Sequence, residues 1–307
     1  MSRQSAFSTF GVEAANMRSL TLLMVASGVV IFVLVAALFT IAIRARRDAI
    51  GHRGGMRLVL WAGAVVPTIV LAALLLGTLP AMRPLRTARN DLIVDVSGEQ
   101  FWWRVGYHAP DGTAITAANE VRVPVGRTVD FRLSAGDVIH SFWIPGLAGK
   151  VDMIPGRTNR LVARATRAGR YRGQCAEFCG LSHALMAFDV IAMEPAAFDR
   201  WLATQRRAVP APVDAVARRG AAVFADAGCA GCHAIAGTAA TGRIGPDFSH
   251  IGARTTLGAG IMPMTTPNLV RFIRNAPAVK PGARMPAYTH LSRADTVAIA
   301  RYLETLQ

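Results

Sequence analysis

The 307-residue sequence has very few lysines, few cysteines and a shortage of acidic side chains. Lysine occurs only at Lys150 and Lys280, so arginine supplies almost all of the 34 basic residues, which face 19 acidic ones. The arginines are scattered and no base-stacking module accompanies them, so nucleic acid is not an expected partner despite the formal net charge of +15. Charged residues make up only 17% of the chain and hydrophobic residues 52%, a balance that predicts membrane segments.

Only four cysteines are present, in two close pairs: Cys175 with Cys179, and Cys229 with Cys232. Two disulfides are conceivable in an exported protein, but neither spacing suggests a disulfide framework. Each pair also has a histidine nearby. Attachment of a metal or a cofactor is therefore the favoured interpretation of both pairs.

Two uncharged stretches, residues 19–43 and 58–82, are each long enough to cross a hydrocarbon core of about 30 Å as a helix. Pro67 lies in the second stretch, where a membrane helix tolerates proline as a kink. The alternative for the first stretch is a cleaved signal peptide. It is disfavoured because the apolar run is too long and no A-x-A-like cleavage site follows it.

The loop between the two stretches is rich in arginine and contains one acid, Asp48. Its basic residues are Arg44, Arg46, Arg47, Arg53 and Arg57. The N-terminal tail has only Arg3 and Arg18. The positive-inside rule therefore predicts a bacterial cytoplasmic-membrane protein with the loop in the cytoplasm and both termini on the outer, periplasmic face. Residues 1–85 are predicted to be the tail and a transmembrane hairpin.

Residues 90–205 contain short runs of alternating apolar and polar residues, separated by Gly, Pro and Asp. The alternation at Val121, Val123 and Val125 is typical of half-buried antiparallel strands, and several such runs predict a Greek-key sandwich or barrel. A short helix from Pro195 is expected to close this domain. Residues 206–213 form a Pro-rich, semi-rigid linker.

Residues 214–307 are rich in Ala, Gly and Arg, and helical patterns lie near both ends. The last one opens with Ser292 as the expected N-cap, with Asp295 three residues later. This pattern predicts a small all-α domain.

The segment GQCAEFCGLSHALM contains Cys175, Cys179, His183 and Met186, and His140 lies upstream. Thiolates, imidazoles and a thioether together suit copper. A zinc site of two cysteines and two histidines is the main alternative. Zinc does not require the thioether, however, and two cysteines are enough to bridge two coppers. A disulfide within the cysteine pair is the least favoured interpretation.

The pattern of an upstream histidine followed by C-x-E-x-C-x-x-x-H-x-x-M resembles the binuclear CuA site of cytochrome c oxidase subunit II, over residues 20–205 or so. The resemblance implies a cupredoxin-like β-sandwich in which Cys175 and Cys179 bridge two coppers. It implies further ligands in His140, His183, the axial Met186 and the backbone carbonyl of Glu177. The Glu177 carboxylate would also reach a magnesium ion at the boundary with subunit I.

An aromatic run, Phe101, Trp102 and Trp103, follows the membrane segment. From the residues alone, a purely structural role, as an interfacial aromatic belt or as core packing, is as good an interpretation as a functional one. The resemblance implies that this run receives electrons for the copper. The family's leading tryptophan is replaced by Phe101, which predicts a changed docking of free cytochrome c. Leu58 stands where family members often carry a glutamate near a proton route, so no role in proton uptake is assigned to it.

The sequence C-A-G-C-H, at Cys229, Cys232 and His233, is the attachment signature of a c-type haem. Both thiols add to the haem vinyl groups, and the histidine is the proximal iron ligand. Met285, in a Met-Pro pair shortly before the last helix, is the predicted opposite ligand. The competing candidates are Met262 and Met264.

The rest of this domain resembles a class I cytochrome c. Pro246 resembles the residue whose carbonyl orients the proximal histidine. Gly220 and Phe224, with Tyr302, resemble the contact between the first and last helices. A non-haem redox or zinc site at the two cysteines would not explain the adjacent histidine together with the Met-Pro pair.

The two resemblances imply the electron-transfer subunit of a proton-pumping haem–copper cytochrome c oxidase, whose subunit I reduces oxygen. Subunit I and subunit III are the implied partners, and the external donor is a cytochrome c or a quinol–cytochrome c reductase. One alternative is a membrane-tethered carrier for another reductase, such as nitric oxide reductase. Another is a structural zinc protein. The fused cytochrome and the change at Phe101 lead to the hypothesis that electrons come from a tethered donor, at an effective concentration of about millimolar.

Overall fold

The computed structural model describes residues 4–5, 7–45, 51–82, 85, 87–88, 91–108 and 114–307. The chain divides into two compact units, residues 15–85 and residues 1–14 with 86–307. Several charges used for the topology prediction, Arg3, Arg46, Arg47 and Asp48, lie outside the described residues.

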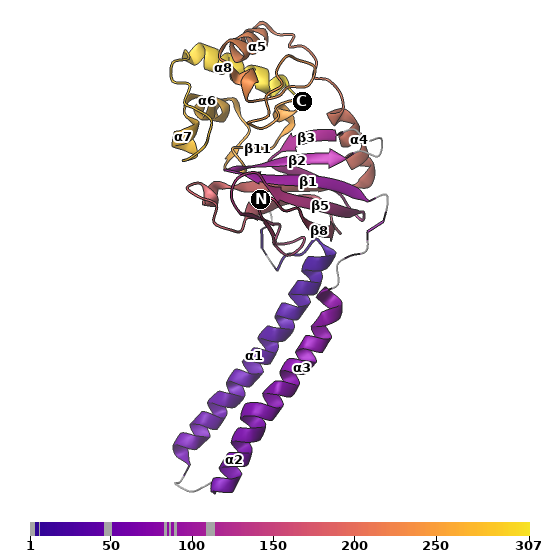
Figure 1. Ribbon diagram of the computed structural model, residues 1–307, viewed down its shortest axis with the longest axis vertical. Helices are drawn as coiled ribbons and strands as arrows, with labels where there is room; N and C mark the ends of the chain where they lie inside the picture. Colours follow the sequence, from indigo (N-terminus) through magenta and orange to yellow (C-terminus); the bar gives the residue numbers. More distant parts are fainter. Residues whose placement is uncertain are drawn as a thin grey trace. The chain divides into compact units, whose positions relative to one another are not determined.

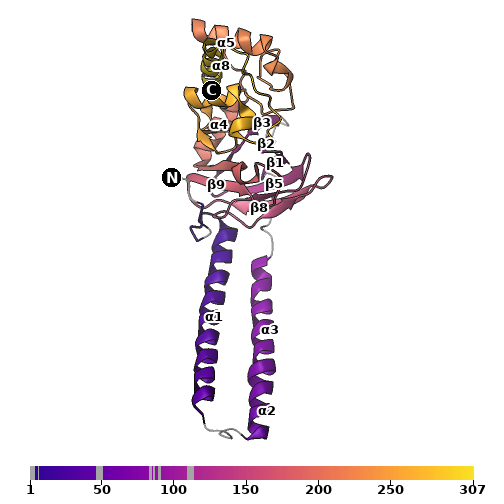
Figure 2. The same cartoon turned by 90° about the vertical axis from the view of Figure 1, so that its left-hand side faces the viewer.

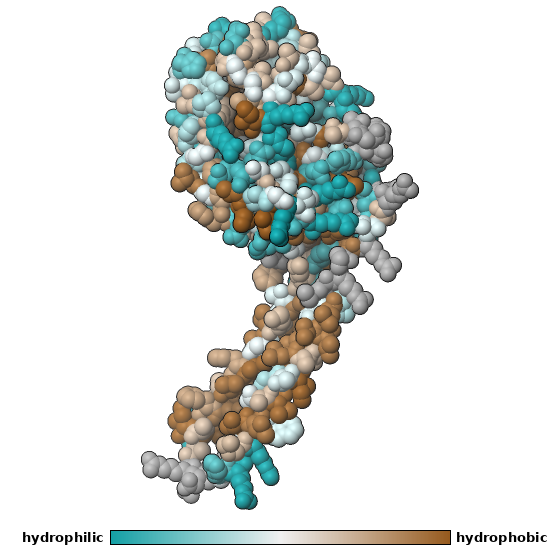
Figure 3. All heavy atoms as spheres, viewed as in Figure 1, coloured by the Kyte–Doolittle hydropathy of each residue, from teal (hydrophilic) through white to brown (hydrophobic). Residues whose placement is uncertain are grey.

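The smaller unit is built from two long apolar helical segments. Their elements are α1 (Val12–Arg44), α2 (His52–Leu60) and α3 (Val66–Thr78). Helix α2 continues through a π-helical turn into α3, and the two segments run side by side (Figures 1 and 2). Apolar side chains cover the visible face of both (Figure 3) and are not buried inside the protein. The two predicted apolar helices are thus present, and each is long enough to cross a membrane.

The helical segment passes Pro67 without ending. The π-helical turn, Trp61–Val65, ends two residues before the proline. Proline lacks a backbone N–H and its ring crowds the carbonyl of the preceding turn, so a wider turn at this point relieves the clash.

The larger unit begins with a β-sandwich of two five-stranded sheets. The first sheet has the order β3 (Ala114–Ala118), β2 (Trp102–His108), β1 (Leu92–Glu99), β5 (Thr128–Ala135), β8 (Asn159–Arg164). The second has the order β4 (Glu120–Pro124), β10 (Ala187–Met193), β9 (Gly169–Cys175), β6 (His140–Trp143), β7 (Val151–Met153). The prediction of antiparallel strands is wrong for two pairs, because β1 runs parallel to β5 and β10 runs parallel to β4. These parallel pairs join strands that are not neighbours in the chain.

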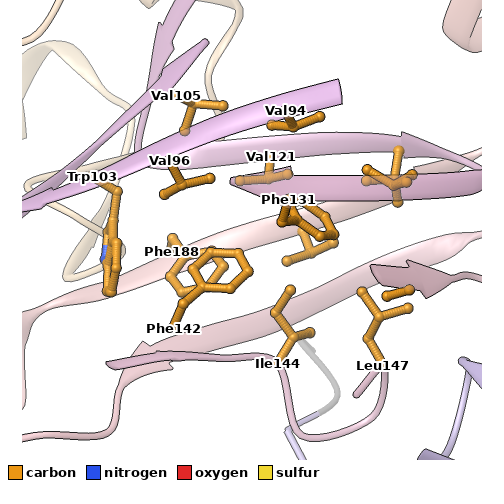
Figure 4. Close-up of a cluster of buried hydrophobic side chains, with 14 of the residues drawn as sticks. Val94, Val96, Trp103, Val105, Val121, Phe131, Phe142, Ile144, Leu147 and Phe188 are labelled. Carbon is orange, nitrogen blue, oxygen red and sulfur yellow. The ribbon is translucent and has the colours of Figure 1, made fainter. Parts of the chain in front are cut away.

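Aromatic rings fill the core between the two sheets (Figure 4). Phe188 stacks on Phe142 with ring centroids 4.7 Å apart and meets Trp103 edge-on at 5.0 Å. Gly173 makes room for Phe188, because a Cβ atom there would lie 2.1 Å from the ring. Each fully buried ring contributes about 1.5–3 kcal/mol, so this cluster fixes the face-to-face packing of the sheets. The predicted helix from Pro195, α4 (Pro195–Gln205), closes one end.

The remaining part of this unit is helical. Its helices are α5 (Ala215–Asp226), α6 (Thr266–Arg274), α7 (Ala276–Val279) and α8 (Arg293–Thr305), with a short strand pair, β11 (Thr256–Leu257) and β12 (Met262–Pro263). The Ser292 hydroxyl accepts the Asp295 backbone N–H at 3.0 Å, which confirms the predicted cap of α8. The Asp214 carboxylate caps α5 in the same way.

Helices α5 and α8 cross at the predicted glycine. A Cβ atom on Gly220 would lie 2.0 Å from the backbone oxygen of Ala298, so only glycine allows the helices this close. Beside it, the rings of Phe224 and Tyr302 meet edge-on at 6.0 Å. The predicted contact between the first and last helices is therefore present.

We expect Gly220→Ala to destabilise the helical domain by about 1–3 kcal/mol, because the backbone oxygen it meets belongs to a packed helix and cannot move aside. Urea unfolding of the detergent-solubilised chain, followed by far-UV circular dichroism, measures the change. Ala222→Leu adds more atoms at an exposed position of the same helix and should change stability by no more than about 0.5 kcal/mol. Equal stability of the two variants would contradict the close-packed crossing.

Candidate functional site

Strand pairing brings the predicted copper ligands together. Cys175 ends β9, and the loop that follows returns to β10, which pairs with β9. His140 begins β6, which pairs with β9 on its other side. The distant histidine is thereby placed beside a loop that already carries the other ligands.

The donor atoms form a compact chain of short contacts. The two cysteine Sγ atoms are 3.9 Å apart. His140 Nδ1 lies 3.8 Å from Cys175 Sγ, and His183 Nδ1 lies 3.7 Å from Cys179 Sγ. Met186 Sδ lies 3.8 Å from Cys179 Sγ, and the Glu177 carbonyl oxygen lies 3.2 Å from Cys175 Sγ. The sulfur separation excludes a disulfide, whose bond is about 2.05 Å.

This arrangement suits two metal ions better than one. Among the described residues, His140, Cys175 and Cys179 have donor atoms that all lie within 4.8 Å of one another, and His183 is not part of that group. A single tetrahedral zinc ion needs all four donors within about 4 Å of one another. Here each imidazole lies beside a different sulfur, so the two cysteines and two histidines would hold two metal ions more readily than one.

A carboxylate behind His140 orients its ring. Asp137 Oδ1 hydrogen bonds His140 Nε2 at 2.9 Å, so Nδ1 faces Cys175. The other oxygen, Oδ2, accepts the Gln100 backbone N–H at 2.8 Å. Carboxylates behind ligating histidines fix the ring and its tautomer, and sequence reasoning did not identify this one.

The thiol pair favours one thiolate even without metal. The hydrogen bond that it shares with the Cys179 thiol, followed by that with His140, lowers the pKa of Cys175. Deprotonated sulfur is the form that binds metal, so the loop is prepared for binding.

The predicted haem-attachment residues line a cavity in the helical domain. Cys229, Cys232 and His233 all face it. His233 Nδ1 donates to the Pro246 carbonyl at 2.7 Å, as predicted, and its ring stacks on Phe248 at 3.9 Å. Burial lowers the pKa of His233, which keeps the ring neutral. With Nδ1 occupied, Nε2 is the nitrogen left for iron, and the residues fit a covalently held haem.

Two of the three candidate methionines line this cavity. Met285 and Met264 are among its lining residues, whereas Met262, in β12, is not. Met285 lies in the segment that leads into α8 and is followed by Pro286, which also lines the cavity. It therefore stays the predicted axial ligand, with Met264 as the alternative.

The turn between β1 and β2 forms part of the cavity wall. Gln100, Phe101 and Trp102 line it together with the haem-attachment residues. The Gln100 side chain donates to the Cys179 carbonyl at 2.6 Å. Trp103 is fully buried, with its ring 6.2 Å from that of His140. Two predicted electron-accepting aromatics thus line the cavity, and the third lies beside the predicted copper ligand His140. Sequence reasoning missed Gln100, which links this turn to Cys179.

Comparison with known proteins supports both halves of the larger unit. Residues 107–193 match the family described as cytochrome C oxidase subunit II, periplasmic domain, and residues 217–307 match cytochrome c.

Relatives named cytochrome c oxidase subunit 2 align over most of the chain. The protein from Alkalihalophilus pseudofirmus is 40% identical over 218 residues, which are 71% of this chain and 62% of that protein. Those from Bacillus sp. PS3 and Bacillus subtilis are 36% and 33% identical over 79% of this chain. These two alignments cover 69% and 70% of the relatives' own lengths.

Among solved structures, the periplasmic domain of subunit II of cytochrome oxidase from Bradyrhizobium japonicum is 30% identical, with a TM-score of 0.37, over 39% of this chain and 97% of that one. With the relatives and the two matched domains, the assignment is clear: the chain belongs to the cytochrome c oxidase subunit 2 family, as a member whose C-terminal part is a fused cytochrome c domain.

Proposed function

We propose that the chain passes electrons from a covalent haem c to a binuclear CuA centre, and from there to the oxygen-reducing subunit I of a proton-pumping oxidase. The haem would be held by Cys229, Cys232, His233 and Met285. The coppers would be held by His140, Cys175, the Glu177 carbonyl, Cys179, His183 and Met186. When bound, these groups supply one-electron redox chemistry, while the protein holds them close together in fixed geometry.

The shared cavity wall is the observation that carries this proposal. Phe101 and Trp102 belong to the copper-site domain, yet they line the cavity of the cytochrome domain. Behind them, Gln100 hydrogen bonds the backbone of Cys179. The path from the haem cavity to a copper ligand is therefore short and passes through packed protein.

This arrangement also supports a tethered donor. Phe101 is only 4% exposed, and Gly282 of the cytochrome domain packs on its ring. A free cytochrome c would have to displace the fused domain to reach this surface. The linker keeps the fused domain at an effective concentration of about millimolar, so an external cytochrome c or quinol–cytochrome c reductase would reduce haem c instead.

The proposal extends to location and partners. The two apolar helices would anchor the chain in the bacterial cytoplasmic membrane, with both termini and the two redox domains on the outer face. Subunits I and III would be its partners, and the Glu177 carboxylate, on a half-buried residue of the ligand loop, would reach magnesium at the subunit I boundary. The names of the relatives favour oxygen over nitric oxide as the final acceptor.

We expect Cys175→Ser in the purified oxidase complex to lose the purple absorption and the mixed-valence multi-line EPR spectrum of binuclear copper, because one bridging sulfur is gone. The external donor should still reduce haem c, while oxygen consumption falls to background. Cys229→Ser is the matched control, since it removes one haem thioether and should leave the copper spectrum intact. A multi-line spectrum that persists in Cys175→Ser would overturn the site, and a wild-type complex that reduces nitric oxide but no oxygen would favour the alternative reductase.

We expect Met285→Ala to leave a covalent haem with an open iron position, because the thioether opposite His233 is removed. Carbon monoxide should then bind the reduced haem c, as measured by its absorption difference spectrum. Met262→Leu lies outside the cavity lining and should behave like the wild type. If Met264→Ala opens the iron and Met285→Ala does not, the axial ligand is Met264.

A further inference from the structure

Lys280 occupies an unusual place for a lysine. It is one of only two lysines in the chain, and it is 4% exposed in the cytochrome domain. Lysine is almost never fully buried unless it is paired, because removing an ammonium group from water is costly. None of the ion pairs among the described residues contains it. Burial lowers its pKa to about 7, a measure of that cost.

The partners of this lysine are backbone carbonyls from both domains. Its Nζ donates to the Gly258 carbonyl at 2.7 Å, within the cytochrome domain. It also donates to the Leu185 carbonyl at 3.0 Å, in the loop of the copper-site domain. Leu185 lies between the predicted ligands His183 and Met186. A compact ammonium group with three donors can bridge two carbonyls in this way, which the planar arginine side chain does less readily.

Two neighbouring hydrogen bonds hold the same loop. The Ser182 hydroxyl donates to the Pro281 carbonyl at 2.6 Å, directly after Lys280 in sequence. The Ala187 backbone N–H donates to the Ala259 carbonyl at 3.1 Å, directly after Gly258. The cytochrome domain therefore contacts the copper loop before, between and after its last two ligands.

The backbone at one of these contacts is strained. Ala259 is fully buried with a φ of 65°, in the left-handed region that a residue with a Cβ rarely adopts. Such a conformation persists only where the surroundings impose it. Its carbonyl accepts the Ala187 N–H in this conformation, so the turn is shaped to fit the copper loop.

We propose that Lys280 is a positioning residue for electron transfer between the two domains. It joins the Gly258 turn to the copper loop and so holds the loop at the haem cavity, which Lys280 itself also lines. The inference rests on the proposed transfer from haem c to copper. Without the ammonium group the loop and the turn separate, and the transfer slows because its rate falls steeply with the gap between donor and acceptor.

The test compares Lys280→Met with Lys150→Met in the purified oxidase. Both changes remove one ammonium group, but Lys150 is exposed and paired with Asp152 at 2.9 Å. A flash-generated electron is placed on haem c without oxygen, and the absorption bands of haem c and copper are followed. Lys280→Met should slow the step from haem c to copper by roughly 10-fold, as for other groups that hold ligands in place. The onward step from copper and the copper spectrum should be unchanged, and Lys150→Met should match the wild type.

Hydrogen–deuterium exchange of the same complexes gives a second measurement that does not depend on activity. The peptide containing residues 182–187 should exchange faster in Lys280→Met and, to a smaller extent, in Ser182→Ala. Ser182 lies in the copper-site domain, and Ser182→Ala removes its hydrogen bond to the Pro281 carbonyl of the cytochrome domain. This variant therefore tests the inference if the Lys280→Met complex does not assemble. In Ser182→Ala the transfer should slow by less than in Lys280→Met.

The outcomes separate this inference from the function on which it rests. No transfer from haem c to copper in the wild type would overturn the proposed function. Normal transfer in the wild type, with unchanged transfer and exchange in Lys280→Met, would overturn the role of Lys280. If that variant does not assemble, unchanged transfer and exchange in Ser182→Ala would overturn it.

Discussion

Two sulfur atoms held 3.9 Å apart, without a bond between them, set the requirements for the structure around them. At this separation the two sulfurs are not bonded to each other, so both remain available to a metal as long as the loop keeps them apart. The loop is held at both ends by the paired strands β9 and β10. The pairing of β6 with β9 places His140 beside the loop, and a hydrogen bond from its ring to Asp137 fixes the orientation of the ring. The sandwich acts as a rigid frame for one short loop.

The cytochrome domain also makes polar contacts with the strands β4 and β10 of the sandwich. Thr255 donates from its backbone N–H and its hydroxyl to Glu120, and Thr256 donates its hydroxyl to Asp189. Both carboxylates are buried and are also paired with arginines of the sandwich. Contacts of this kind add little net stability. A cytochrome domain docked in another orientation, however, would leave the two buried carboxylates without these hydrogen bonds, which costs free energy. They therefore favour one docked orientation.

That orientation explains why the aromatic run is divided between two roles. Trp103 is part of the sandwich core and touches Phe188 and Phe142, so its packing stabilises the fold while its ring lies near His140. Phe101 lies in the turn between β1 and β2, Trp102 begins β2, and both line the cavity of the cytochrome domain. Core packing thus applies to Phe101 and Trp103, and Phe101 and Trp102 also line the cavity of the cytochrome domain.

The sequence by itself determined the features whose parts lie close together in the chain. Three local patterns are of this kind: the spacing of the predicted ligands in residues 175–186, the C-A-G-C-H signature and the two apolar stretches. Each can be interpreted from residues that are close together in the chain. Alternation likewise predicted the strands, but not that two pairs are parallel, because strand order is a property of the whole fold. Only the tertiary structure decided the contacts that span large sequence separations. Gln100 reaches Cys179 across 79 residues, and Lys280 reaches Leu185 across 95. Neither residue belongs to a motif, because a hydrogen bond to a backbone carbonyl places no demand on the sequence of its partner.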